Sequence, residues 1–414
     1  MFIELHIIQN FPPSNLNRDD LGQPKDADFG GYRRARISSQ CLKRAIRGSH
    51  PEPDIRNRSV FARYTKVPLS MRTKLLKGEL TKRLTAAGRE ESTARAVAGQ
   101  FAEAYAGKMD AKRKDETAVL LYLSDSELAS ISERLQKSWD DATSFVAEIE
   151  RWEAKVKQAK AEGKKEPSRP TSNLFEDIVA SLIKETRQRT GAPDIALFGR
   201  MLADKPETNI DAACQVAHAV STNSIAGRTP IDYYTAVDEL KSSTDPGAGF
   251  LDVAYFNSAC FYRYARIDYN QLVKNLGGDH ELAQRSVEAF LRASEAAIPS
   301  GKKNAFAQEC RPSFMLAVVR SSNSDGWSLV NAFQKPVDPR VEPDGDLVKG
   351  SVRRLEKHFE HLVGFYGLET VKACAVALPD GAVETEDLNE RFGANVKNMN
   401  GWVDTVTNAL RNGG

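Results

Sequence analysis

The hydrophobic pattern changes its period along the chain, and this order of segments restricts the fold more than any single motif does. Residues 2–8 alternate between apolar and polar side chains, as a half-buried strand does. From about residue 70 to 165 the pattern becomes helical and rich in Ala, Glu, Lys and Arg. It then ends in a linker with several helix breakers at 163–172. The helical block therefore reads as an insertion into a fold that begins with a strand.

Further strands and helices follow the insertion. Strand-like segments are predicted at 194–198, 253–267, 311–320 and 371–378, and helices at 281–297, at 347–365 and from 388 onward. Strand–helix–strand units on an antiparallel sheet make up the ferredoxin-like plan, which RNA-recognition motifs share. The sequence therefore predicts an α+β fold of the ferredoxin-like plan.

A basic segment at 33–47 follows the first strand. It holds six Lys and Arg and no acid, whereas the whole chain of 414 residues is balanced, with 58 basic and 56 acidic side chains. Ser38 or Ser39 can cap a helix here, and Gly48 followed by Pro51 can end it. Leu42, Ala45 and Ile46 would form the buried side, which leaves on one exposed face Gln40, Lys43, Arg44 and Arg47. Such a face suits phosphate groups, although a merely solvated charged helix is the alternative.

Other polar residues could complete a binding surface for single-stranded RNA. Further cations are Arg18, Lys25 and Arg36, together with Lys302 and Lys303 in a second basic loop. Asn17, Ser38 and Gln40 can form hydrogen bonds to phosphate or ribose.

Cysteine and histidine usage excludes several classes of protein. The five cysteines are far apart and form no CxxC pair, which indicates reduced thiols in a cytoplasm and argues against disulfides or structural zinc. The six histidines show no metal-ligand spacing, and His218, in an apolar stretch, is predicted to be a packed core residue. No run is long enough to span a membrane, and no glycine-rich phosphate loop is present. We expect no cofactor and no metal.

An ordered series of motifs resembles the backbone subunit of the type I-E CRISPR complex Cascade, the CasC family. At the N-terminal end these motifs are LNRDD at 16–20, KDA at 25–27, FGG at 29–31, RRARISSQ at 33–40 and LKRA at 42–45. Downstream they are ALFGRM at 196–201, AHA at 217–219, IDYYTAVD at 231–238, FYRYA at 261–265, NLGG at 275–278 and NAF at 331–333.

The resemblance implies a fold described as a hand, whose palm is a modified RNA-recognition-motif sheet. Its palm would comprise residues 1–55, 191–220 and 259–414, its helical fingers 56–190, and its thumb hairpin 221–258. It also implies a multi-copy subunit without catalytic activity. Copies would stack head to tail along one guide RNA (crRNA), and large, small and capping subunits would complete the complex that reads target DNA.

Particular residues receive roles from the same resemblance. The segment 17–25 and the helix at 38–47 would cradle the guide backbone, and Met201 would lie against the bases. Tyr233, Tyr234 and Thr235 would mark where the thumb folds over the RNA. The alternatives are core packing for Met201 and contact with a neighbouring subunit for the two tyrosines.

A lysine cluster lies at the end of the helical insertion. It comprises Lys155, Lys157, Lys160, Lys164 and Lys165, with nearby glutamates as partial offsets. Lysine suits non-specific contact with a phosphate backbone, so these residues could face target DNA. A solvated helix end is the alternative.

Two other functions compete with guide binding. The four aspartates Asp19, Asp20, Asp26 and Asp28 could hold Mg²⁺ for cleavage of RNA, although the interleaved cations favour salt bridges that shape the loop. A filament-forming scaffold that needs no RNA is the other possibility, because head-to-tail interfaces form open filaments unless they are capped.

Overall fold

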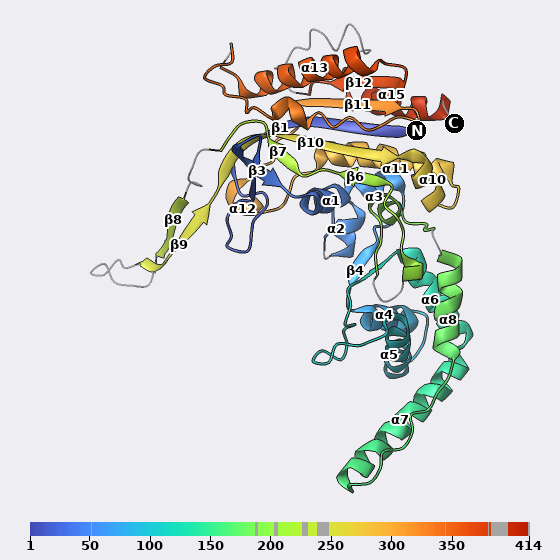
Figure 1. Ribbon diagram of the computed structural model, residues 1–414. Helices are drawn as coiled ribbons and strands as arrows, with labels where there is room; N and C mark the ends of the chain where they lie inside the picture. Colours follow the sequence, from blue (N-terminus) through green and yellow to red (C-terminus); the bar gives the residue numbers. More distant parts are fainter. Residues whose placement is uncertain are drawn as a thin grey trace. The chain divides into compact units, whose positions relative to one another are not determined.

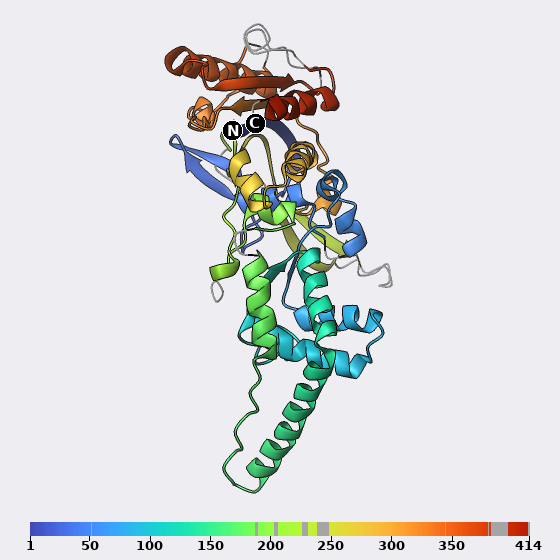
Figure 2. The ribbon, with the colours of Figure 1, turned by 90° about the vertical axis from the view of Figure 1, so that its right-hand side faces the viewer.

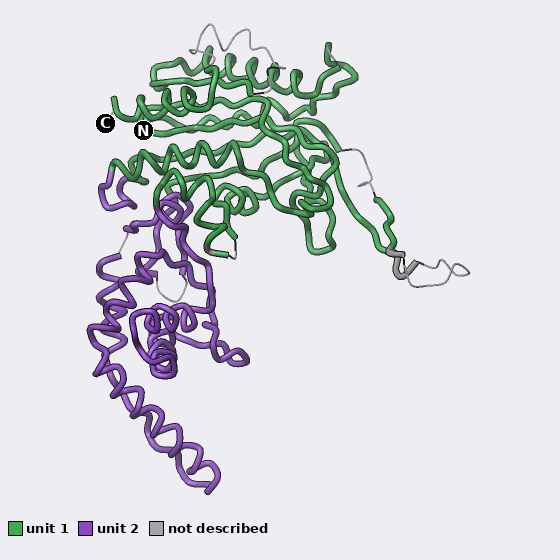
Figure 3. Tube along the Cα trace, turned by 180° about the vertical axis from the view of Figure 1, so that it is seen from behind, with its two compact units in different colours: residues 1–66, 213–272, 280–414 green, residues 67–212, 273–279 purple. Residues whose placement is uncertain are grey.

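The computed structural model describes residues 1–50, 52–186, 189–202, 206–225, 231–237, 248–343, 345–379, 381 and 396–412 (Figure 1). The chain divides into two compact units (Figure 3). Unit 1 comprises Met1–Lys66, Ala213–Leu272 and His280–Gly414, and unit 2 comprises Val67–Ala212 and Val273–Asp279. The units divide after Lys66 and after Ala212, whereas the palm and fingers were predicted to divide after residues 55 and 190.

Unit 1 is built on one antiparallel sheet. Its strand order is β12 (Val371–Ala377), β11 (Phe314–Arg320), β1 (Phe2–Ser14), β10 (Asn257–Asp268), β7 (Ala219–Ser221), β3 (Tyr32–Ile37) and β2 (Asp26–Phe29), and β6 (Cys214–Val216) also pairs with β10. Each pairing between these strands is antiparallel. The α+β class and the strands predicted near 2–8, 253–267, 311–320 and 371–378 are confirmed.

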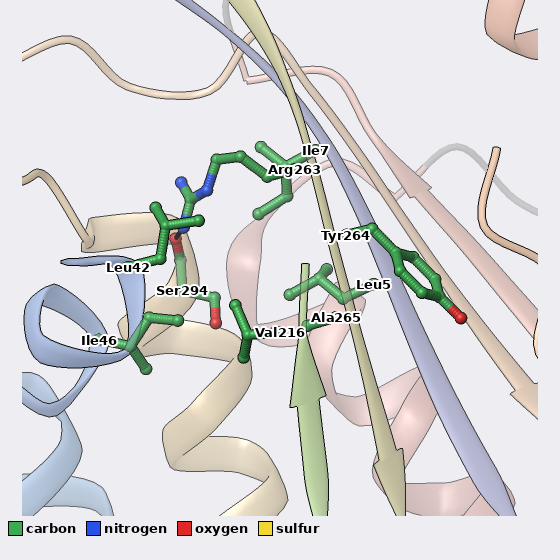
Figure 4. Close-up of a pocket in the computed structure, with 9 residues that line it drawn as sticks. All are labelled: Leu5, Ile7, Leu42, Ile46, Val216, Arg263, Tyr264, Ala265 and Ser294. Carbon is green, nitrogen blue, oxygen red and sulfur yellow. Dashed lines mark hydrogen bonds between the residues drawn. The ribbon is translucent and has the colours of Figure 1, made fainter. Parts of the chain in front are cut away.

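Helices cover both faces of this sheet. On one face, Leu42 and Ile46 of α1 (Ser39–Arg47) point toward Leu5 and Ile7 of β1, as Figure 4 shows. α11 (His280–Ala296) packs beside α1 and α3 (Val60–Thr65). On the other face, α13 (Leu347–Tyr366) places Phe359 in a core with residues of β1, β10 and β11. When the elements between them are left out, β1, α1, β7, β10, α11 and β11 follow one another along the chain in a β-α-β-β-α-β order.

Smaller elements complete unit 1. They are α2 (Pro53–Asn57), α10 (Tyr269–Asn275, which ends in unit 2), α12 (Lys303–Phe306), the 3₁₀ turn Val330–Phe333 and α15 (Met399–Asn412). The last helix was expected from residue 388, but residues 388–395 lie outside the described part of the chain. Two antiparallel strands, β8 (Ile231–Val237) and β9 (Ala248–Tyr255), form the hairpin expected within 221–258.

Unit 2 is mainly helical and has its own core. It contains β4 (Met71–Thr73), α4 (Leu76–Ala86), α5 (Glu91–Ala106), β5 (Leu121–Leu123), α6 (Asp125–Lys137), α7 (Trp139–Ala161), α8 (Leu174–Thr186), α9 (Pro193–Phe198) and the 3₁₀ turn Pro206–Thr208. Leu80, Phe101, Leu128 and Phe175 are among the apolar side chains buried between its helices. The segment after α7 runs back beside it, and the Trp152 indole donates to the Pro167 carbonyl at 3.0 Å (Figure 2).

One predicted strand is wrong. Residues 193–198 form the helix α9. Pro193 lies in its first turn, where the backbone N–H that proline lacks would have no hydrogen-bond partner within the helix. All six residues of α9 are buried. A fully buried segment need not alternate between apolar and polar side chains, so the sequence pattern could not distinguish a strand from a buried helix.

Candidate nucleic-acid interface

The basic helix α1 forms where the sequence predicted it, and Leu42 and Ile46 are buried, but Ala45, expected on the buried side, is half-buried. Ser38 is its N-cap and accepts a hydrogen bond from the Cys41 amide at 3.3 Å, and Gly48 ends it in the left-handed conformation with φ of 66°. Gln40 and Arg44 are exposed and Lys43 is half-buried. Arg47, expected on the same exposed face, is buried, because α3 and α11 both pack against α1.

A loop brings further polar groups to the start of α1. The Asn17 side-chain carbonyl accepts from the Ser38 amide at 2.8 Å, and its backbone carbonyl accepts from the Lys25 amide at 2.8 Å. The Lys25 carbonyl in turn accepts from the Arg36 amide at 2.9 Å. Arg18 lies on the same loop and is exposed. The structure therefore gathers Asn17, Lys25 and Arg36 at the end of α1 where anions are favoured.

His218 belongs to this surface, so its prediction as a packed core residue is wrong. Its side chain is exposed, and Nδ1 lies 3.1 Å from Nη1 of Arg36 and 3.4 Å from the amide of Ser39. Partial burial, followed by the positive charges of Arg36 and Lys25, lowers the pKa of His218. The apolar neighbours in sequence misled the prediction, because His218 lies between two short strands and not within one.

Arg34 supports the surface from below. This member of the basic segment is fully buried. Its guanidinium donates to the carbonyls of Ser221 and Thr222 at 2.8 and 3.0 Å and to those of Phe333 and Gln334 at 2.7 and 3.2 Å. Arg34 thus fixes β3 and the cations that follow it, and it is not itself available to a ligand.

Arg263 holds the sheet beneath α1. It is buried, and it donates to the Gln9 side chain at 2.6 Å and to the Ser294 carbonyl at 2.8 Å. Burial lowers its pKa to about 10. Figure 4 shows its side chain reaching from β10 toward Leu42.

The second basic loop, at 301–303, lies against the chain just before Asn17. A Cβ atom at Gly301 would approach the carbonyl oxygens of Asn15 and Leu16 to 2.4 and 2.5 Å, so only glycine permits this contact. Lys302 follows with a φ of 44°, and Lys303 forms an ion pair with Glu309. Of the two lysines, Lys303 is thus partly neutralised within the chain.

The β8–β9 hairpin exposes two tyrosine side chains to solvent. Tyr233 is 65% exposed and Tyr234 43% exposed, and Thr235 is exposed as well. The Tyr234 hydroxyl donates to Asp252 on β9 at 2.8 Å, which orients its ring. Phe256, at the base of the hairpin, packs on Phe306 of α12 with ring centroids 5.9 Å apart.

Met201 in unit 2 is 84% exposed, so it does not fill a core. It borders a cavity of about 540 Å³ that is also lined by Arg72, Leu120 and Tyr122. The preceding turn is held by the buried Arg200, which donates to Glu127 at 2.6 Å, and by Gly199, where a Cβ would lie 3.0 Å from the Ile210 carbonyl. The turn therefore presents Met201 to an approaching group.

The lysine cluster is exposed along and after α7. Lys155, Lys157 and Lys160 lie on the helix, and Lys164 and Lys165 follow it. Lys164 pairs with Glu162 at 2.7 Å and Lys160 approaches Glu166 at 3.5 Å. Within the described part of unit 2, no ion pair is seen for the other three lysines.

Two of the four loop aspartates accept hydrogen bonds from residues nearby in the sequence. Asp19 accepts from the amides of Leu21 and Gln23 at 2.9 and 2.8 Å, and Asp26 accepts from Nε of Arg33 at 2.7 Å. Asp20 and Asp28 are exposed. Over the described residues, no three His, Cys, Asp or Glu side chains come together as metal ligands would. No described helix is long and apolar enough to cross a membrane.

Fold and surface together define an α+β protein whose antiparallel sheet supports a cationic helix suited to anionic ligands. The model of the CT1975-like protein family matches residues 3–403, so the chain belongs to that family. Two solved structures are similar along nearly the whole chain. A chain of a "CRISPR RNA-guided surveillance complex, pre-nicking" is 28% identical with a TM-score of 0.77, and the match covers 99% of this chain and 100% of that one.

A chain of a "CRISPR RNA-guided surveillance complex" is 24% identical with a TM-score of 0.68 and the same coverage, and it supports the fold alone. A search of curated proteins found no match.

Proposed function

We propose that this protein is a subunit of a CRISPR RNA-guided surveillance complex, and within it a multi-copy backbone subunit that binds guide RNA without cleaving it. The observation that carries the proposal is the convergence of Lys25, Arg36 and Arg44 at α1, on a sheet like that of a surveillance-complex chain. The motifs that resemble the type I-E family support a Cascade backbone subunit in particular. We propose that this subunit works in the cytoplasm.

The arrangement suits the backbone of a single strand. Cations around α1 neutralise phosphates, and Asn17 and the Ser38 cap keep the loop and helix in register. Exposed aromatic and thioether side chains at Tyr233, Tyr234 and Met201 offer surfaces for bases. In this proposal, head-to-tail copies hold one guide extended, so that base pairing reads target DNA while the protein recognises backbone and shape.

Salt dependence tests the guide-binding surface. Six cations, Arg18, Lys25, Arg36, Lys43, Arg44 and Lys302, predict that log K for single-stranded RNA falls against log[salt] with a slope of about −4, from about −0.7 per contact. Replacing Lys43 and Arg44 by alanine should flatten the slope by about 1.4. Lys357→Ala with Lys372→Ala is the matched control, because both side chains are exposed on other elements of unit 1. Equal slopes in the two double variants would remove α1 from the interface.

Cleavage of bound RNA tests the non-catalytic part of the proposal. Bound RNA should stay intact with Mg²⁺ or Mn²⁺ present, in the wild type and in the Asp20→Asn and Asp28→Asn variants. Cleavage by the wild type that disappears in either variant would favour a nuclease.

A further inference from the structure

We infer that His218 is a guide-contacting residue that donates a hydrogen bond from Nε2 to a phosphate oxygen of the bound RNA strand. The inference rests on the proposed guide-binding function and adds a neutral imidazole donor to the cations and polar side chains of this surface. Sequence patterns gave no reason to place His218 there, and the structure does so through its contacts with Arg36 and Ser39.

The tautomer of His218 follows from its two neighbours. Nη1 of Arg36 is a donor and never an acceptor, and the guanidinium keeps its protons in proteins. At 3.1 Å it requires a lone pair on Nδ1 of His218, and the Ser39 amide, at 3.4 Å, approaches the same nitrogen as a donor. Nδ1 is therefore unprotonated, and the single proton of the neutral ring sits on Nε2.

The charge state agrees with this geometry. Partial burial and the nearby cations Arg36 and Lys25 lower the pKa of His218, so the ring is neutral near pH 7. A ring that carries its proton on Nε2 cannot accept a proton there, and its Nδ1 is occupied. His218 in this state is a donor and not a general base.

The surroundings select an anionic oxygen as the acceptor. His218 is exposed beside Lys25 and Arg36 at the N-terminal end of α1, where positive charge and the helix dipole favour phosphate. A phosphate placed between these cations lies within reach of a neutral N–H donor on the same surface. A hydrogen bond to a charged oxygen contributes more than one between neutral groups.

Two amide replacements separate the nitrogen atoms of the ring. His218→Asn keeps an acceptor near the position of Nδ1 and leaves no donor at Nε2, whereas His218→Gln places an amide N–H near Nε2. We expect the affinity of the full chain for a single-stranded RNA oligonucleotide to fall about tenfold in His218→Asn and about threefold or less in His218→Gln. His361→Ala is the control, because His361 is exposed on α13.

Salt dependence gives a second readout that a structural role would not reproduce. A neutral donor releases no counterion, so His218→Asn should lower affinity without changing the slope of log K against log[salt], unlike the Lys43 and Arg44 double variant. Nitrogen-15 spectra of the free chain with labelled histidine should show the Nε2–H tautomer.

Equal affinity in the Asn and Gln variants, whether both normal or both weak, would overturn the inference, as would an Nδ1–H tautomer. Wild-type protein that binds no RNA would overturn the proposed function and with it this contact, whereas wild-type binding with unaffected His218→Asn overturns the contact alone.

Discussion

The two cationic regions of this protein are built in opposite ways. Around α1, buried and half-buried side chains fix the backbone that carries the cations: Arg34 anchors β3 through four carbonyls, and Asn17 ties the 17–25 loop to the cap of the helix. At the end of α7, by contrast, the five lysines are exposed, and among the described residues two surface ion pairs hold them.

This difference predicts different kinds of binding. A cation that the fold already orders, as Arg36 is by the Asp26 carbonyl and His218, loses little conformational freedom on contact with a strand and can impose a register on it. Each flexible lysine, in contrast, loses rotamer entropy when it is ordered. We therefore expect α1 to hold the guide in a defined position. The lysines of α7 should add a diffuse attraction for another phosphate backbone, that of target DNA.

The largest expected effect concerns Arg34. Arg34→Met should destabilise unit 1 by more than about 3 kcal/mol, because four carbonyls, three of them buried, lose their donor together. Lys155→Ala should change the stability of unit 2 by less than about 0.5 kcal/mol, as an exposed substitution does. Hydrogen exchange resolved by segment measures both. Unchanged protection of β3 and β7 in Arg34→Met would show that the guide surface does not depend on this buried guanidinium.

Acid should affect the stability of the two units differently. His6 is buried in the sheet of unit 1, and burial lowers its pKa to about 4. Because the unfolded chain takes up the proton first, the free energy of unfolding of unit 1 should decrease as pH falls from about 6.5 to about 4, by up to roughly 3 kcal/mol. In unit 2, burial raises the pKa of Tyr105 to about 12, so this group titrates only in base.

Hydrogen exchange at several pH values, with the intrinsic rates taken into account, checks this order of unfolding. His6→Gln should remove most of the slope in unit 1. An acid response of equal size in wild type and His6→Gln would assign the effect to other groups.

The smallest expected effect belongs to the lysine cluster. Changing all five lysines to alanine should weaken the binding of target DNA by the assembled complex a few-fold, and more at low salt than at high salt, while guide loading stays intact. Filter binding with the two nucleic acids at two salt concentrations measures this. Equal loss of guide RNA would place the cluster on the guide, and no loss of either would make it a solvated helix end.

Local sequence patterns predicted much of this structure, and the rest depends on tertiary contacts. Ser38 and Gly48 predicted the ends of α1 correctly, and Leu42 and Ile46 are buried as their spacing predicted, because capping and periodicity act within a few residues. The burial of Arg34 and Arg47 and the exposure of His218 depend on segments far away in sequence, which no local pattern encodes. The basic segment therefore predicted where cations gather but not which of its members are exposed.

The central claim is that α1 and its loop hold a guide RNA, and the RNA that accompanies the protein tests it most directly. The protein should be purified with its complex and the bound RNA extracted and sequenced, with the Lys43→Ala, Arg44→Ala double variant prepared in parallel. We predict a uniform population of RNA with repeat-derived ends in the wild type and a marked loss of that population in the variant. Random cellular fragments, or no RNA at all, in the wild type would contradict the claim.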